Sequence, residues 1–190
     1  MKIQSIHLKH ILHFADLKVD FSYHDKPVTL ILGDQASGKT SILRFSYQAL
    51  TWFAARYKDL RSAGVVMLDH DIMLNRLQSK IDIQVAVPAE LYALKPTAAD
   101  TATEPYTWQL YKTLNQQGIG ISRVETLELE QLVNLYQQAT LQDPLQGLPL
   151  IAYYPAERFV NEMNILSKNN PLIFQHAHAY EISAIPYTTF

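Results

Sequence analysis

The chain has 190 residues, of which 48% are apolar and 18% are charged, with a formal net charge of -2 and no cysteine. This length and apolar content suit one buried core and exclude global disorder, and the charge excludes a strongly basic nucleic-acid-binding arm. The lack of cysteine excludes a disulfide scaffold, a Cys-ligated zinc site and a thiol nucleophile, and no apolar run approaches the ~20 residues of a membrane span. We therefore expect a cytoplasmic protein that has no membrane partner.

The first half of the chain carries extended patterns on either side of one helical pattern. Apolar periodicity predicts two amphipathic strands within residues 3–21, a turn at 24–27, a strand at 28–32 that is apolar on both faces, a helix over 40–57 and a strand over 81–87. An Ala/Thr/Pro-rich stretch follows, and its residues 95–105 are expected to form a loose excursion.

The second half is expected to begin with a strand over 106–112. Ser122 and Glu125 have the spacing of a capping box, which predicts that a helix begins there. The apolar run 148–154 predicts a second buried strand, and residues 161–190 show little periodicity. No linker marks a domain boundary, so we interpret residues 1–190 as a single domain.

The most specific pattern is the run Gly33-Asp34-Gln35-Ala36-Ser37-Gly38-Lys39-Thr40, which satisfies G-x-x-x-x-G-K-[ST]. It lies between a predicted strand and a predicted helix, so its backbone N–H groups would converge on a polyphosphate at the helix N-terminus. Lys39 would reach the β- and γ-phosphates, and the Thr40 hydroxyl would ligate Mg²⁺. The pattern therefore predicts a Walker A loop for a nucleotide and Mg²⁺ over residues 33–41, with Ser41 as its last member.

The segment LILGDQASGKTSIL, residues 30–43, resembles the ABC-type ATPase heads of the SMC/RecF class, whose members begin with strand patterns like that of residues 3–21. Residues 69–72 and 150–158 are similar to a narrower RecF-like group of predicted ATP-binding (AAA) proteins, with relatives in phage-defence and retron systems. The resemblance implies an α/β P-loop NTPase fold. The chain would form the N-terminal lobe of a head, with an antiparallel β subdomain and a central, mostly parallel sheet flanked by helices.

The same resemblance implies ATP and Mg²⁺ as ligands, a head-to-head homodimer, and a link to DNA or phage defence that the charge does not show. In that class the Walker B pair, the signature motif and the switch histidine lie in a C-terminal half, and none is found in this sequence. We therefore expect an incomplete ATPase domain. It would bind ATP, with Lys39 as its catalytic residue, and hydrolyse it only with a C-terminal lobe or a partner head.

Three residues outside the loop are weaker candidates for the same site. Asp69 ends the apolar run 65–68 in the manner of a Walker B strand and would hold Mg²⁺ through water, although it follows the loop more closely than in an ABC head. Arg158 follows the predicted strand 148–154, where it would contact phosphate or a partner, with a structural salt bridge as an equal alternative. Gln175 is a candidate for the glutamine that senses the γ-phosphate through Mg²⁺ in such heads.

Other ring-bearing and basic residues have simpler structural explanations. Three residues near the N-terminus would face a bound base, but a solvated strand face explains them better: Lys9, His10 and His13. Three aromatic residues on the helix after the loop are expected in the core: Trp52, Phe53 and Tyr57. His176 and His178 alternate as metal ligands on a strand would, but no third ligand is near them in sequence.

Two other classes of function stay open. A self-contained small P-loop kinase or NTPase would need a lid of arginines, and the 5 basic residues after position 94 are too scattered to form one. An interaction module that uses nucleotide for assembly is compatible with the low charge and with the 11 Tyr and 7 Phe residues. Nucleotide-induced dimerisation favours a head, whereas phosphoryl transfer to a substrate favours a kinase.

Overall fold

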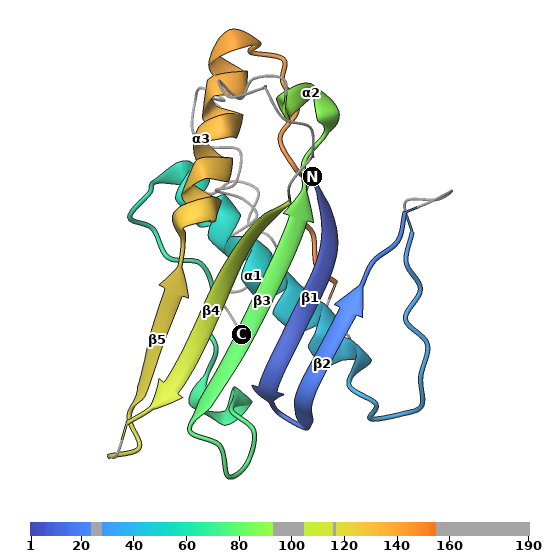
Figure 1. The fold of residues 1–190 in the computed structure, drawn as a ribbon, viewed down its shortest axis with the longest axis vertical. Coiled ribbons are helices and arrows are strands. Elements are labelled where there is room, and N and C mark those ends of the chain that lie inside the picture. The colour runs from blue at the N-terminus through green and yellow to red at the C-terminus, as the bar shows by residue number, and fades with distance from the viewer. Residues whose placement is uncertain (24–27, 93–104, 116, 155–190) are drawn as a thin grey trace, which may run out of the picture.

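The computed structural model describes residues 1–23, 28–92, 105–115 and 117–154, which form one antiparallel sheet with helices packed against it (Figure 1). The elements in chain order are β1 (Lys2–Ile11), β2 (Phe14–Asp20), α1 (Lys39–Lys58), the 3₁₀ turn η1 (Asp69–Asp71), β3 (Gln78–Ala86), α2 (Ala89–Tyr92), β4 (Tyr106–Leu114), β5 (Gly120–Glu125) and α3 (Leu127–Gln142).

The five strands pair in the order β2-β1-β3-β4-β5, and every pairing is antiparallel. Side chains alternate between the two faces of the sheet because successive residues of a strand point in opposite directions. On β3, Ile81, Ile83 and Val85 are fully buried, whereas Lys80 and Asp82 lie on the opposite face. The sheet therefore has one apolar face for the core and one polar face.

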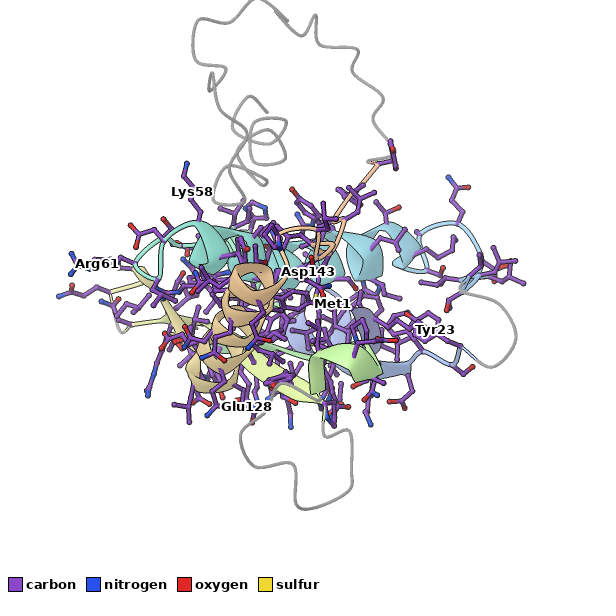
Figure 2. All side chains as sticks on the ribbon, turned by 90° about the horizontal axis from the view of Figure 1, so that it is seen from above. Met1, Tyr23, Lys58, Arg61, Glu128 and Asp143 are labelled. Atoms are coloured by element: carbon purple, nitrogen blue, oxygen red, sulfur yellow. The ribbon has the colours of Figure 1, made fainter. Side chains whose placement is uncertain are left out.

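The core lies between the apolar face of the sheet and the helices. Helix α1 runs along this face, as the view from above shows (Figure 2), and Trp108 of β4 donates its indole N–H to the carbonyl oxygen of Ala49 at 3.0 Å. Helix α3 packs beside α1, with the Tyr136 ring edge-on to Phe53 at a centroid distance of 5.4 Å. Both rings are essentially inaccessible to solvent, so the two helices and the sheet share one core.

The α/β class, the N-terminal antiparallel subdomain and the helix after the loop are confirmed. The predicted strands within 3–21, 81–87 and 106–112 correspond to β1, β2, β3 and β4. The turn predicted at 24–27 and residues 95–104 of the predicted excursion lie outside the described residues. Within the described part of the chain, no helix is both long and apolar enough to cross a membrane.

The expected strands at 28–32 and 148–154 are wrong for the described structure, because neither segment forms a strand. Leu32 is 81% exposed and Leu150 is 94% exposed, so these apolar runs are not buried on both faces. A strand needs a hydrogen-bonded neighbour as well as an apolar sequence, and all pairing among the described residues is antiparallel and excludes these segments. The mostly parallel central sheet is therefore not formed by the described residues.

The predicted capping box is also wrong. Ser122 and Glu125 belong to β5, where they pair with Lys112 and Gln109 of β4. Helix α3 begins one turn later, after Thr126, whose hydroxyl donates to the Glu130 carboxylate at 2.7 Å. The sequence shows a capping signal here and no strand-forming periodicity. Pairing with the neighbouring strand nevertheless decides the structure of these residues.

Candidate nucleotide-binding site

The predicted phosphate loop runs directly into the N-terminus of α1. Gly38 is the N-cap of the helix and has a left-handed backbone (φ 87°), which glycine adopts without steric cost. Ala36 is also left-handed (φ 61°), and the Ser37 N–H donates to the Asp34 carbonyl oxygen at 3.3 Å. The loop therefore makes a tight turn immediately before the helix.

The first turn of α1 presents backbone donors at the end of this loop. The first α-helical hydrogen bond joins the Ile42 N–H to the Gly38 carbonyl at 3.0 Å, so the N–H groups of Lys39, Thr40 and Ser41 precede the intrahelical ladder. No acidic side chain lies in this turn. The free donors and the positive end of the helix dipole favour an anion here.

The Lys39 side chain folds back over the loop. Its amine donates to the carbonyl oxygens of Gly33 at 2.8 Å and Asp34 at 2.5 Å, and it lies 3.2 Å from the Ser37 hydroxyl. These contacts bring the two ends of the sequence motif together and fix one positive charge at the helix N-terminus. Such an arrangement can bind a phosphate group through backbone N–H donors and a lysine ammonium.

The turn between β1 and β2 lies against the same loop. A Cβ atom placed on Gly38 would lie 2.6 Å from His13 Nε2 and would also collide with the ring of Phe14. The two rings pack on each other with their centroids 4.0 Å apart. The phosphate loop therefore has a wall of two aromatic rings that comes from a different part of the sequence.

A buried ion pair fixes the position of this turn, and no sequence pattern indicated it. Asp71 is fully buried and accepts from Arg44 of α1 at 2.5 Å and from the Leu68 N–H at 2.8 Å. The Asp71 carbonyl in turn accepts from the Leu12 N–H at 2.8 Å. The start of α1, the η1 segment and the β1–β2 turn are thus joined by hydrogen bonds.

Asp69 does not lie on a strand. Residues 65–68 form a loop with its valines and Leu68 partly exposed, and Asp69 begins η1. Its carboxylate pairs with the Lys112 amine of β4 at 2.9 Å. The strand of the Walker B kind that would precede Asp69 is therefore absent from the described structure, while the role of Asp69 as a magnesium ligand stays a prediction.

The remaining predicted residues separate into three groups. Trp52, Phe53 and Tyr57 are confirmed as core residues. Lys9 lies 3.6 Å from Asp16 across the β1–β2 pair, which agrees with a solvated strand face. The candidates that lie outside the described residues are Arg158, Gln175, His176 and His178.

The donor set of the loop fits Mg²⁺ in part. Mg²⁺ in nucleotide sites is held by one or two protein oxygens together with phosphate oxygens. The exposed Thr40 hydroxyl, in the first turn of α1, is an oxygen donor of the required kind. In the described part of the chain, no three His, Cys, Asp or Glu side chains gather into a metal site, so most of the ligands would be phosphate and water oxygens.

Comparisons with known proteins add evidence that covers most of the chain and not the loop alone. A family model described as "AAA domain" matches residues 5–182. The curated protein "Retron Vc95 probable ATPase" from Vibrio cholerae serotype O1 biovar El Tor is 24% identical over 164 residues, which cover 84% of this chain and 29% of that protein. The chain thus spans less than a third of the length of this relative.

Two solved structures are more distant matches. One, described as "Structural biochemistry of ATP-driven dimerization and DNA stimulated activation of SMC ATPases", has a TM-score of 0.40 and 14% identity, covering 71% of this chain and 79% of that chain. The other, "Crystal structure of the SmcHead bound to the C-winged helix domain of ScpA", has a TM-score of 0.41 and 14% identity, covering 74% of this chain and 41% of that chain.

Proposed function

The chain belongs to the AAA domain family, and on that premise we propose that it is the ATP-binding part of an SMC/RecF-like ATPase. The retron ATPase that it resembles supports ATP as the nucleotide, since the two sequences align over 84% of this chain. Residues 33–41 are the proposed Walker A loop. The lack of cysteine suits the reducing cytoplasm, where we place its activity.

One observation carries the proposal: the motif from Gly33 to Thr40 forms a turn whose lysine amine lies on the loop carbonyls and whose end carries the free N–H groups of the first turn of α1. A triphosphate has the charge and the oxygen acceptors that these donors require. The loop backbone binds the phosphates, with Asp34, Gln35 and Ala36 contributing main-chain atoms.

Each remaining residue of the motif has its own role. Lys39 leaves the loop carbonyls to pair with the β- and γ-phosphates, and it is the proposed catalytic residue because it neutralises charge at the group that is transferred. Thr40 supplies the protein oxygen for Mg²⁺, and Ser41 donates its backbone N–H to phosphate. When bound, Mg²⁺ would neutralise part of the charge of the phosphates.

Hydrolysis requires more than these residues. In the described part of the chain, no strand of the Walker B kind precedes Asp69, and the Asp69 carboxylate is paired with Lys112. We therefore place the groups that orient the attacking water on a C-terminal lobe or a partner head, which makes residues 1–190 an incomplete domain. A role in DNA transactions or phage defence is an extension of this proposal, and it comes from the SMC/RecF resemblance of the sequence.

The test measures ATP binding and turnover of the 190-residue chain and of its Lys39→Ala variant. We expect the wild-type chain to bind ATP–Mg²⁺ and to hydrolyse it slowly or not at all. We expect Lys39→Ala to weaken binding at least about tenfold, because it removes a charged hydrogen-bond donor worth about 1.5–3 kcal/mol. Lys58→Ala, at the opposite end of α1, is the matched control and should bind ATP like the wild-type chain.

Three outcomes would contradict the proposal in different ways. Equal ATP binding by the wild-type and Lys39→Ala chains would show that the loop is not part of the ATP-binding site. Rapid turnover that depends on Lys39 would contradict the incomplete domain and would favour Asp69 as a magnesium ligand. Transfer of phosphate to a small acceptor would favour the kinase alternative.

A further inference from the structure

The β1–β2 turn brings a histidine to the phosphate loop, where the sequence motif does not place one. His13 Nε2 would lie only 2.6 Å from a Cβ atom on Gly38, the residue that caps α1 and precedes Lys39. Figure 1 shows the β1–β2 turn and the N-terminus of α1 at the same end of the sheet. The imidazole is therefore a neighbour of the backbone that would hold the phosphates.

The turn is held in a conformation that its own sequence does not favour. His10 and Leu12 both have left-handed backbones, with φ values of 53° and 51°, although neither is a glycine. Two hydrogen bonds hold this backbone, one from Leu12 N–H to the carbonyl of Asp71 in η1 and one from the N–H of Met73, just after η1, to the His10 carbonyl, both at 2.8 Å. Strained backbone of this kind persists where the surroundings fix it, and it is concentrated at functional sites.

The same contacts tie His13 to the helix that carries Lys39. Asp71 is buried and binds Arg44, which lies five residues after Lys39 on α1. Chain segments from both sides of the site are thus joined through Asp71, whose carboxylate binds Arg44 of α1 and whose main-chain carbonyl accepts from the Leu12 N–H of the β1–β2 turn. His13 keeps its position relative to the phosphate loop because both are anchored to the same helix.

The imidazole of His13 is available to bind a ligand. Its side chain is exposed, its ring packs on Phe14 at 4.0 Å, and within the described residues it makes no hydrogen bond or ion pair. An imidazole N–H can donate a hydrogen bond to a phosphate oxygen. We propose that His13 is a further phosphate-binding residue of this site, which donates from the β1–β2 turn beside Gly38. This inference rests on the proposed function of the loop.

The test uses the complete 190-residue chain and calorimetric titration with three probes: ATP–Mg²⁺, inorganic tripolyphosphate and adenosine. His13→Ala should weaken binding of both ATP and tripolyphosphate by about 5- to 20-fold, the loss expected for one hydrogen bond to a charged group. His13→Gln keeps an N–H donor on a neutral side chain and should recover part of the loss. Binding of adenosine should be the same in all variants.

His7→Ala is the matched control, since it removes an imidazole from β1 at the polar face of the sheet, away from the β1–β2 turn that carries His13. It should leave both affinities unchanged. Thermal unfolding of each variant checks the fold, and an exposed residue such as His13 should shift the midpoint little.

The outcomes separate this inference from the proposed function. If His13→Ala weakens ATP but not tripolyphosphate, the imidazole contacts the base and the inference is overturned. If Lys39→Ala abolishes binding while His13→Ala changes neither probe, the proposed function stands and His13 has no part in it. If the wild-type chain does not bind ATP, the proposed function fails and the inference fails with it.

Discussion

At Gly38 the backbone passes through the left-handed region directly beneath the rings of His13 and Phe14. Two separate requirements therefore meet at one residue: a positive φ angle and the absence of a side chain. Gly118, in the β4–β5 turn, has a similar φ of 75°, but a Cβ atom placed on it would have nothing within 4 Å. The two glycines differ in their neighbours and not in their backbone.

This difference gives a prediction for Gly38→Ala. The variant should lose about 2–4 kcal/mol of unfolding free energy, from the left-handed backbone and from displacement of the two rings. Gly118→Ala should lose only about 1 kcal/mol, because it carries the backbone strain alone. Urea unfolding measures both values, and equal losses would show that the rings do not press on the loop in solution.

The sequence indicated the loop but not its surroundings, and the reason is the range over which each signal acts. The phosphate loop is a continuous motif, so its residue types and spacing are read directly from Gly33 to Thr40. The wall formed by His13 and the pair between Arg44 and Asp71 join residues about 25 positions apart. No local pattern specifies such contacts, and only the fold brings them together.

At the scale of elements, the β1–β2 pair is held at its polar face by charged side chains. His7 lies between two carboxylates, with Nε2 2.6 Å from Asp16 Oδ1 and Nδ1 3.5 Å from Asp82 Oδ2. Asp16 also lies 3.6 Å from the Lys9 amine. The hydrogen bond from His7, and then the positive charges of His7 and Lys9, hold the pKa of the Asp16 carboxyl below its ordinary value of 3.8.

The direction of this pKa shift sets a pH dependence. A carboxyl whose folded pKa is lowered stabilises the fold above pH 3.8, its unfolded pKa, and this contribution is lost as the pH falls through the folded pKa. We expect NMR titration to give Asp16 a higher pKa in His7→Ala than in the wild-type chain. Lys18→Ala, which removes the partner of Asp20 at 3.1 Å, is the control variant and should leave the Asp16 pKa unchanged. An unchanged Asp16 pKa would exclude His7 as the cause.

Elements with strong alternation were predictable, whereas those defined by a neighbour were not. The strict alternation of β3 and β4 follows from one buried face, and this pattern is visible in the sequence. Strand β5 has exposed Ile121 and no comparable pattern, so only its pairing with β4 reveals it. The apolar runs at 28–32 and 148–154 predicted burial on both faces, which requires neighbours that the described residues do not supply.

At the scale of the whole molecule, the low charge and the exposed apolar side chains both favour association with other protein chains. Several of the most exposed apolar residues lie in the two extended segments or after α3: Val28, Leu30, Leu32, Leu145, Leu150 and Tyr154. Leu74, Leu127 and Leu141 are similarly exposed elsewhere. Where such side chains form a contiguous patch, the patch marks a site of interaction with another molecule. A formal net charge of -2 adds little repulsion between copies of the chain.

If the proposed head-to-head arrangement is correct, nucleotide should control association of the chain. We expect the mass from sedimentation to rise from one chain toward two when ATP and Mg²⁺ are added, because a ligand bound between two copies favours the dimer by mass action. Lys39→Ala should remain at the mass of one chain under the same conditions. Leu32→Ser tests the apolar surface separately: it should reduce any association that occurs without ATP, and should leave ATP binding unchanged. Association that is equal with and without ATP, and that Leu32→Ser abolishes, would assign self-association to the apolar segments and contradict a nucleotide-controlled dimer.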